Sequence, residues 1–140
     1  MNEPINIWAT TAVAGSGATP GTATGAALEN RSDIMQMTQA TEYAVLRPAE
    51  PGAWPHGLRL ALASRIARLN QADGLAGRYL EMLGAASQYT PLADPANSDT
   101  RPDLSACLAF TDNDATRPSD MSDEDNKTLQ TAGISDADIV

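Results

Sequence analysis

Apolar residues recur every three or four positions along most of the chain after residue 31, which is the spacing of amphipathic helices. The pattern is clearest over residues 55–69, where a proline takes a favoured first-turn position. The apolar stripe of this segment consists of Leu58, Leu62, Ile66 and Leu69. The other side carries Arg59, Arg65 and Arg68. We therefore predict a helix with one buried face and a solvated, arginine-rich face.

Two more helices are predicted beside this one. Residues 32–46 present one apolar face, which consists of Ile34, Met37, Ala40, Tyr43 and Ala44. Pro48 closes that segment, because the residue before a proline avoids helical backbone angles. A further segment begins at Asp73 and continues to Gly84, with Leu75, Tyr79, Leu80 and Leu83 at helical spacing. Because only residues 70–72 separate it from the preceding helix, the two are expected to pack as an antiparallel hairpin.

The last third of the chain predicts two more complete helices. The first begins at Pro102 and ends near residues 112–114, and its inward side chains are Leu104, Cys107 and Leu108. The second has Ser122 as N-cap, acidic residues in its first turn, an inward Leu129 and Gly133 as a left-handed C-cap. No alternating run bounded by turn residues follows residue 30, so a sheet is not expected. The predicted fold class is all-α.

The two ends of the chain differ from this pattern. Residues 1–31 include a Gly/Ala/Thr tract that cannot bury enough surface to offset its ordering entropy, so we expect a flexible arm followed by a helical domain over residues 32–140. At the other end, Ser135 is a good N-cap, Asp136 and Asp138 suit a helix N-terminus, and Ile139 begins an apolar stripe. The expectation is a C-terminal helix that is truncated.

Charge is distributed unevenly along the chain. The formal net charge is −9, and residues 87–140 hold three basic residues against eleven acidic ones, a charge of −8. Such a segment lacks the basic footprint that nucleic acid or an anionic membrane surface requires. No run approaches the apolar length of a membrane span, and the first residues carry an acid where a secretory signal needs positive charge. We expect a cytoplasmic protein that binds neither nucleic acid nor membrane.

Two ligand motifs are matched incompletely. Residues 15–21 follow an apolar run and imitate the glycine turn of a dinucleotide site, but Pro20 interrupts the turn and no further strand follows. A flexible linker is the better interpretation. The oxygen-bearing residues with the spacing of a calcium loop are Asp112, Asp114, Thr116, Asp120 and Asp123. Arg117 replaces the required glycine, so solvated and capping carboxylates are the better interpretation. No metal or cofactor is expected.

Single nucleophilic or titratable residues provide only weak catalytic candidates. Cys107 is the one cysteine, so it can form no internal disulfide, and between Leu104 and Leu108 it is expected to be an inert core residue. His56 lies in a predicted first helical turn, where the positive end of the helix dipole disfavours the imidazolium. Tyr79 is the third candidate, should a pocket form between helices at a subunit interface.

A family resemblance rests on the order of several blocks. These blocks are residues 41–52, 58–70, 75–79, 104–110 and 129–140, which resemble small proteins of the carboxymuconolactone decarboxylase and alkylhydroperoxidase superfamily. The resemblance implies an all-helical, oligomeric fold of packed hairpins, here with the long C-terminal core helix missing. The peroxidase branch has a Cys-x-x-Cys pair followed by histidine, which this chain lacks. No catalytic residue is therefore carried over from the family.

Three functions follow as expectations. The resemblance implies an oxidoreductase of the peroxidase-related kind, or a subunit of one, in a homo-oligomer or beside a partner that supplies the missing helices. A lactone decarboxylase would need a general acid or base near an anionic substrate, whose carboxylates the arginines of residues 59–68 could bind. The competing class is a non-catalytic helical binding or assembly module whose apolar stripes a partner completes.

Overall fold

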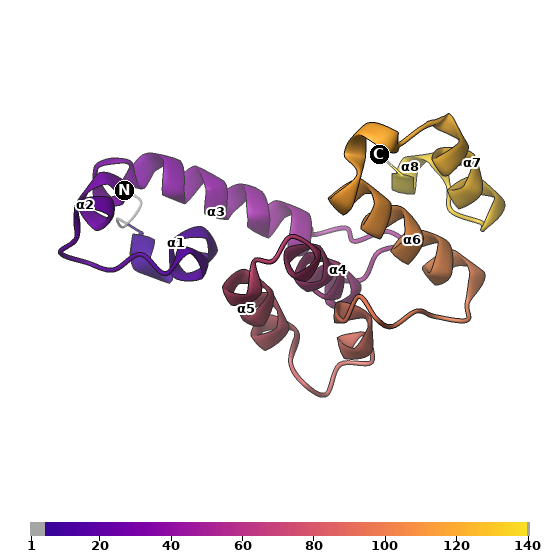
Figure 1. Cartoon of the computed structure of the whole chain (residues 1–140), viewed down its shortest axis with the longest axis horizontal. Helices are drawn as coiled ribbons and strands as arrows, with labels where there is room; N and C mark the ends of the chain where they lie inside the picture. Colours follow the sequence, from indigo (N-terminus) through magenta and orange to yellow (C-terminus); the bar gives the residue numbers. More distant parts are fainter. Residues whose placement is uncertain (1–4, 140) are drawn as a thin grey trace. The chain divides into compact units, whose positions relative to one another are not determined.

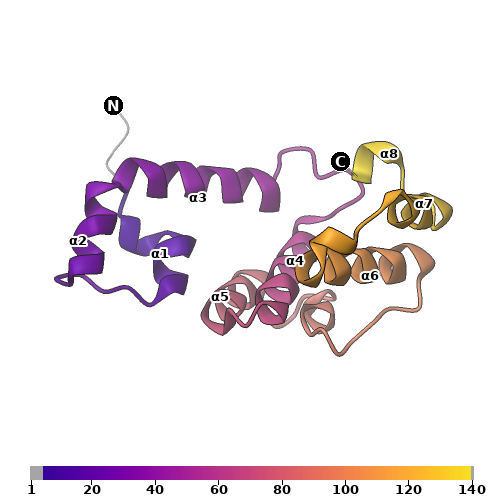
Figure 2. The same cartoon turned by 45° about the horizontal axis from the view of Figure 1, so that its top comes forward.

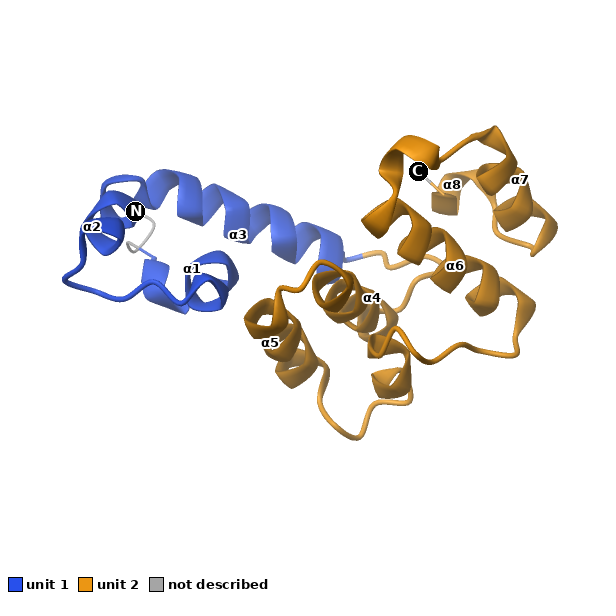
Figure 3. Cartoon of the chain, in the orientation of Figure 1, with its two compact units in different colours: residues 1–49 blue, residues 50–140 orange. Residues whose placement is uncertain are grey.

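The computed structural model describes residues 5–139, and every regular element within them is helical, which confirms the all-α prediction. The chain forms two compact units (Figure 3): unit 1 comprises residues 1–49 and unit 2 comprises residues 50–140. The division thus follows Ala49, whereas the sequence placed it after residue 31. It does so because the long helix over residues 32–46 packs with the elements that precede it.

Unit 1 contains three α-helices and a short 3₁₀ turn among its described residues. The turn η1 spans Ile7–Ala9, α1 spans Thr11–Ser16, α2 spans Ala23–Asn30 and α3 spans Ser32–Leu46. In Figures 1 and 2, α1 lies along α3. Residues 1–4 of the expected flexible arm lie outside the described residues. Within residues 5–31, helices form where the sequence predicted no secondary structure.

Side-chain hydrogen bonds and small residues explain how this tract is ordered. Thr11 donates its backbone N–H to Gln39 Oε1 at 2.7 Å and its hydroxyl to Glu42 Oε1 at 2.8 Å. Val13 is buried beside it. Gly25 is also buried, because the Thr19 carbonyl oxygen occupies the space that a Cβ would need. Small and hydroxyl-bearing residues thus let the backbone pack closely and offset part of the ordering entropy.

The same hydrogen bonds decide which face of α3 turns inward. The apolar face predicted for this segment includes Met37 and Tyr43, yet these side chains are 64% and 60% exposed. Gln39 and Glu42 point toward α1 instead, because the Thr11 donors need acceptors there. Met37 and Tyr43 are therefore not on the face that packs within unit 1, and the bounds of the helix agree with the sequence pattern.

Unit 2 contains the helices that the sequence predicted. They are α4 at His56–Leu69, α5 at Asp73–Leu83, α6 at Pro102–Thr116, α7 at Asp123–Thr131 and α8 at Asp136–Ile139. Two 3₁₀ turns, η2 at Thr90–Ala93 and η3 at Pro118–Asp120, connect them. Val140, the last residue of the expected C-terminal helix, lies outside the described residues. Only α6 differs noticeably, since it continues two residues past its predicted end.

Local signals account for these bounds. Pro102 begins α6, and α6 stops before Arg117 because that residue precedes a proline. At α7, the Asp125 carboxylate accepts a hydrogen bond from the Ser122 N–H at 2.8 Å, which is the reciprocal bond of a capping box around the predicted N-cap. Gly133 has a φ of +97° just after that helix, which a residue with a side chain rarely adopts.

In unit 2, α4 lies between α5 and α6, and α7 packs against α6 (Figures 1 and 2). Between α4 and α5, the buried Ser64 hydroxyl donates to the Ala76 carbonyl at 2.9 Å. That pairing agrees with the predicted helical hairpin, whose antiparallel direction stays a prediction. The main core cluster consists of Leu58, Ala61, Leu92, Ala93, Leu104 and Leu108. A second cluster consists of Cys107, Leu129 and Ile134.

Candidate functional site

The structure places the three catalytic candidates on three different helices. Cys107 lies on α6, His56 at the start of α4 and Tyr79 on α5. The cluster around Cys107 contains Leu129 and Ile134 with apolar neighbours, and neither His56 nor Tyr79 belongs to it. His56 is exposed and Tyr79 is half-buried. No catalytic constellation follows from these placements.

Cys107 behaves as the core residue that its spacing predicted. Its side chain belongs to the buried cluster, and the residue is 8% exposed. Burial raises the pKa of the thiol above its ordinary value, although a hydrogen bond with Thr111 acts in the opposite direction. Because the thiolate is the reactive form, a raised pKa and poor access both lower the reactivity toward peroxide.

The arginine-rich face of α4 is not a solvated surface, which corrects the sequence interpretation. Arg65 is 2% exposed. Its guanidinium donates to both carboxylate oxygens of Asp112 on α6, with Nη2–Oδ2 at 2.7 Å. It also donates to carbonyl oxygens of η2 and the loop that follows it, at Leu92, Asp94, Pro95 and Asn97, over 2.8–3.2 Å.

This network uses the whole donor fork of the guanidinium. Arg65 thereby joins α4, α6 and the loop over residues 92–97 into one structure. Arg59 is likewise engaged, since it donates to the carbonyl oxygens of Trp54 at 2.8 Å and Pro51 at 3.1 Å. These two arginines therefore stabilise the fold, and a substrate carboxylate would have to compete with their internal acceptors.

Neither the residues with calcium-loop spacing nor the glycine-rich segment adopts the geometry of the site that its sequence resembles. Asp112 and Asp114 lie within α6, and Asp123 lies in the first turn of α7, so they are not arranged in one loop. Among the described residues, no group of three or more His, Cys, Asp or Glu side chains is placed to hold a metal ion. Residues 7–9 form a 3₁₀ turn in place of the strand that a dinucleotide site needs.

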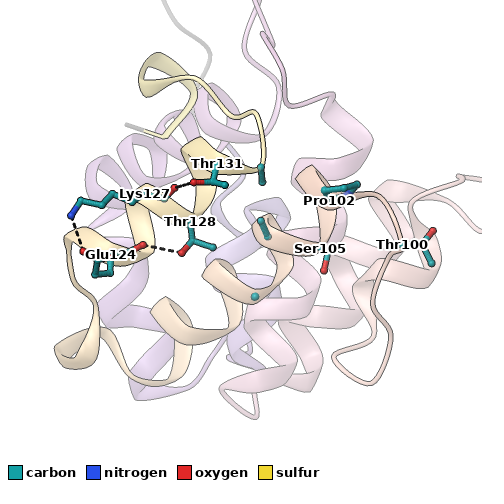
Figure 4. A pocket seen from close by; sticks show the side chains of 10 residues that line it. Thr100, Pro102, Ser105, Glu124, Lys127, Thr128 and Thr131 are labelled. Carbon is teal, nitrogen blue, oxygen red and sulfur yellow. Dashed lines mark hydrogen bonds and ion pairs between the residues drawn. The ribbon is translucent and has the colours of Figure 1, made fainter.

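A shallow, open groove lies between α6 and α7 (Figure 4), with a volume of about 690 Å³. Its lining residues are Thr100, Pro102, Ser105, Ala106, Ala109, Glu124, Lys127, Thr128, Thr131 and Ala132. The α6 side is made of small residues, whereas the α7 side is mostly polar. These small side chains allow another backbone to approach the groove closely.

Hydrogen bonds within α7 fix the polar wall of the groove. The Thr128 hydroxyl donates to the Glu124 carbonyl at 2.9 Å, and the Thr131 hydroxyl donates to the Lys127 carbonyl at 2.8 Å (Figure 4). Lys127 Nζ donates to Glu124 Oε1 at 2.7 Å. Both hydroxyl protons are thus used within α7, so this wall offers few donors to a ligand.

Sequence reasoning missed the groove, although a signal was present. Leu104, Cys107 and Leu108 fix the buried face of α6, so the small residues Ser105, Ala106 and Ala109 must lie on another face. On α7, Leu129 is buried and the helix is otherwise polar. A stripe of small residues beside a polar helix indicates a shallow surface between the two helices.

Comparisons with protein-family models, curated proteins and solved structures give no match for this chain. The resemblance to the carboxymuconolactone decarboxylase and alkylhydroperoxidase superfamily therefore stays a prediction. In the part of the chain that the structure describes, no helix is both long and apolar enough to cross a membrane. Oligomeric state and cytoplasmic location also stay predictions.

Proposed function

We propose that unit 2 is a non-catalytic binding module, and that a helical segment of a partner protein docks in the α6–α7 groove. The observation that carries this proposal is the groove itself, which is lined on one side by Pro102, Ala106 and Ala109. Grooves between helices commonly take an amphipathic helix, whose side chains at intervals of three and four residues pack against the floor.

The hydrogen bonding of the groove favours a helix over an extended peptide. An extended segment must find partners for its backbone N–H and C=O groups, whereas a helix satisfies most of them internally. The hydroxyls of Thr128 and Thr131 already donate within α7. The groove therefore suits a ligand that binds through complementary shape and apolar contacts and needs few hydrogen bonds to its backbone.

The enzyme alternatives have less support. An oxidoreductase of the peroxidase-related kind would rely on Cys107, which is buried and has a raised pKa. A lactone decarboxylase would rely on arginines of α4, of which Arg65 is saturated by internal acceptors. Among the described residues, no buried side-chain nitrogen or oxygen lacks a hydrogen-bond partner, so a substrate would find no unpaired polar side chain in the interior.

Selection from a displayed library of helical peptides tests the proposal. The full chain serves as bait, and the binding of each enriched peptide to an Ala109→Trp variant, whose indole would fill the groove, is then measured separately. Ala40→Trp is the matched control, since Ala40 is an exposed helical alanine of α3. We expect selected peptides to bind the wild type and the control alike and to bind Ala109→Trp about tenfold more weakly, or 1.4 kcal/mol.

A different pattern would contradict the proposal. If no peptide is enriched, or if enriched peptides bind Ala109→Trp as well as they bind the wild type, the groove is not a docking surface. If the wild type turns over peroxide and Cys107→Ser does not, the oxidoreductase hypothesis is supported instead. Circular dichroism of all variants establishes that each one keeps its helical content.

A further inference from the structure

We infer that the helix received by the α6–α7 groove is basic, with Lys or Arg side chains that meet acidic groups at the rim of the groove. This inference rests on the proposed function and specifies the chemistry of the partner. The groove combines small side chains on its α6 side with acidic residues nearby, so a basic helix with an apolar face would complement both.

The first supporting observation is the position of the acidic side chains. Asp103 is in the first turn of α6, next to the lining residue Pro102. On α7, the first turn contains Asp123 and Asp125 beside the lining residue Glu124. First-turn carboxylates stabilise their own helices, but they keep their negative charge while doing so. Acidic residues therefore lie close in the sequence to both walls of the groove, where they outnumber the cations Arg101 and Lys127.

The second observation is the charge of the whole segment that builds the groove. Residues 87–140 have a formal charge of −8, and the whole chain has −9. A field of this sign attracts a basic partner over distances of about 10 Å and repels an acidic one. It also disfavours a second copy of this chain as the occupant, since that copy would bring another nine negative charges.

The ion pair at the groove shows how a basic helix could be accommodated. Glu124 is 79% exposed and Lys127 is 63% exposed, so their contact is a surface pair. Such pairs contribute little to stability, because solvent screens them. A cation of the partner can therefore share the Glu124 carboxylate without disrupting the fold. Replacement of Glu124 removes this acceptor and leaves the positive charge of Lys127 beside the incoming helix.

Two synthetic helical peptides test the inference. They share the same Ala and Leu positions, but one has Lys and the other Glu at every polar position, and fluorescence anisotropy measures their binding to the full chain. We expect the Lys peptide to bind at least about tenfold more tightly than the Glu peptide at low salt. Its affinity is expected to fall as salt rises from about 50 mM to about 300 mM, because screening shortens the range of the attraction.

Charge-matched variants separate the groove from the general field. Glu124→Gln is expected to weaken binding of the Lys peptide about fivefold or more, whereas Glu81→Gln, an identical change at an exposed position of α5, has little effect. Equal losses in the two variants would mean that only the overall charge matters and would overturn the inference.

The failure of the inference differs from the failure of the proposed function. If both peptides bind alike, or the Glu peptide binds better, and Ala109→Trp still blocks binding, the groove is a docking surface for a partner that is not basic. If binding of the Lys peptide is insensitive to Ala109→Trp, the groove is not the site, and both proposals are refuted.

Discussion

Replacement of the buried Arg65 by methionine should destabilise unit 2 more than replacement of Arg59 or Arg68, which are half-buried on the same helix. Methionine keeps the apolar stem but removes every hydrogen bond of the guanidinium. Those hydrogen bonds reach the Asp112 carboxylate and four carbonyl oxygens of residues 92–97. The substitution therefore disconnects α4 from α6 and from that loop at once.

The magnitude follows from which groups lose a partner. Removal of one partner from a buried pair costs about 3–5 kcal/mol. The Asp112 side chain is 31% exposed, so water can hydrate it after the change, and the lower part of that range applies. The Leu92 carbonyl belongs to a buried residue, and an unsatisfied buried acceptor costs about 1–3 kcal/mol. We expect a total loss of about 4 kcal/mol or more.

Urea unfolding followed by circular dichroism measures this loss as a change in the free energy of unfolding. Arg68→Met is the control, since Arg68 is half-buried on the same helix, and it should cost less than about 1 kcal/mol. Arg65→Lys should recover part of the stability, because its ammonium keeps the charge but cannot form the planar fork. If Arg65→Met unfolds within about 0.5 kcal/mol of the wild type, the network does not hold unit 2 together.

Further predictions concern the thiol, two glycines and one carboxylate. Cys107 should react with a thiol reagent at neutral pH much more slowly in the native chain than in urea, because burial raises its pKa and limits access; equal rates would contradict this placement. Gly25→Ala should reduce helical content and expose unit 1 to protease, since the added Cβ would collide with the Thr19 backbone. Gly77→Ala, whose Cβ meets open space in α5, should stabilise the chain by about 0.5–1 kcal/mol. A destabilising Gly77→Ala beside a neutral Gly25→Ala would refute the packing of unit 1. The Asp99 carboxylate accepts hydrogen bonds from Arg101, so its pKa should be about 2 in place of 3.8. The stability that this contact adds is therefore present above pH 3.8 and is lost as the pH falls toward 2. Carbon-detected NMR should show that the pKa of Asp99 returns toward 3.8 in Arg101→Gln, and an unchanged pKa would contradict the role of Arg101.

Much of unit 2 could be predicted from the sequence because local signals fix its helices. Pro102, the Ser122 cap and Gly133 act within one turn of the backbone, and the predicted bounds of α4, α5 and α7 agree with the structure. The inward position of Cys107 was equally predictable, since helical spacing places it with Leu104 and Leu108.

Long-range contacts were not predictable in the same way. Nothing in the spacing of Arg65 reveals that Asp112, forty-seven residues later, accepts its guanidinium hydrogen bonds. The sequence also gave no reason to place Leu92 and Ala93 in the core, because a polar, proline-rich stretch surrounds them. These features arise when separate elements meet, so periodicity within one element cannot show them.

Unit 1 illustrates a different limit. Its Gly/Ala/Thr tract offers little apolar area, and composition alone therefore predicted a flexible arm. The structure orders residues 5–31 through hydrogen bonds from Thr11 to Gln39 and Glu42 and through close packing at Gly25. Gln39 and Glu42 therefore face α1, whereas the more hydrophobic Met37 and Tyr43 are exposed.

Amide chemical shifts of the isotope-labelled full chain, recorded with the best selected peptide, would map where that peptide binds. The largest shifts should fall on residues 102–109 and 124–132, the two walls of the groove, and they should vanish in Ala109→Trp. Shifts that centre elsewhere, or that persist unchanged in Ala109→Trp, would contradict the claim that this chain acts by docking a helix between α6 and α7.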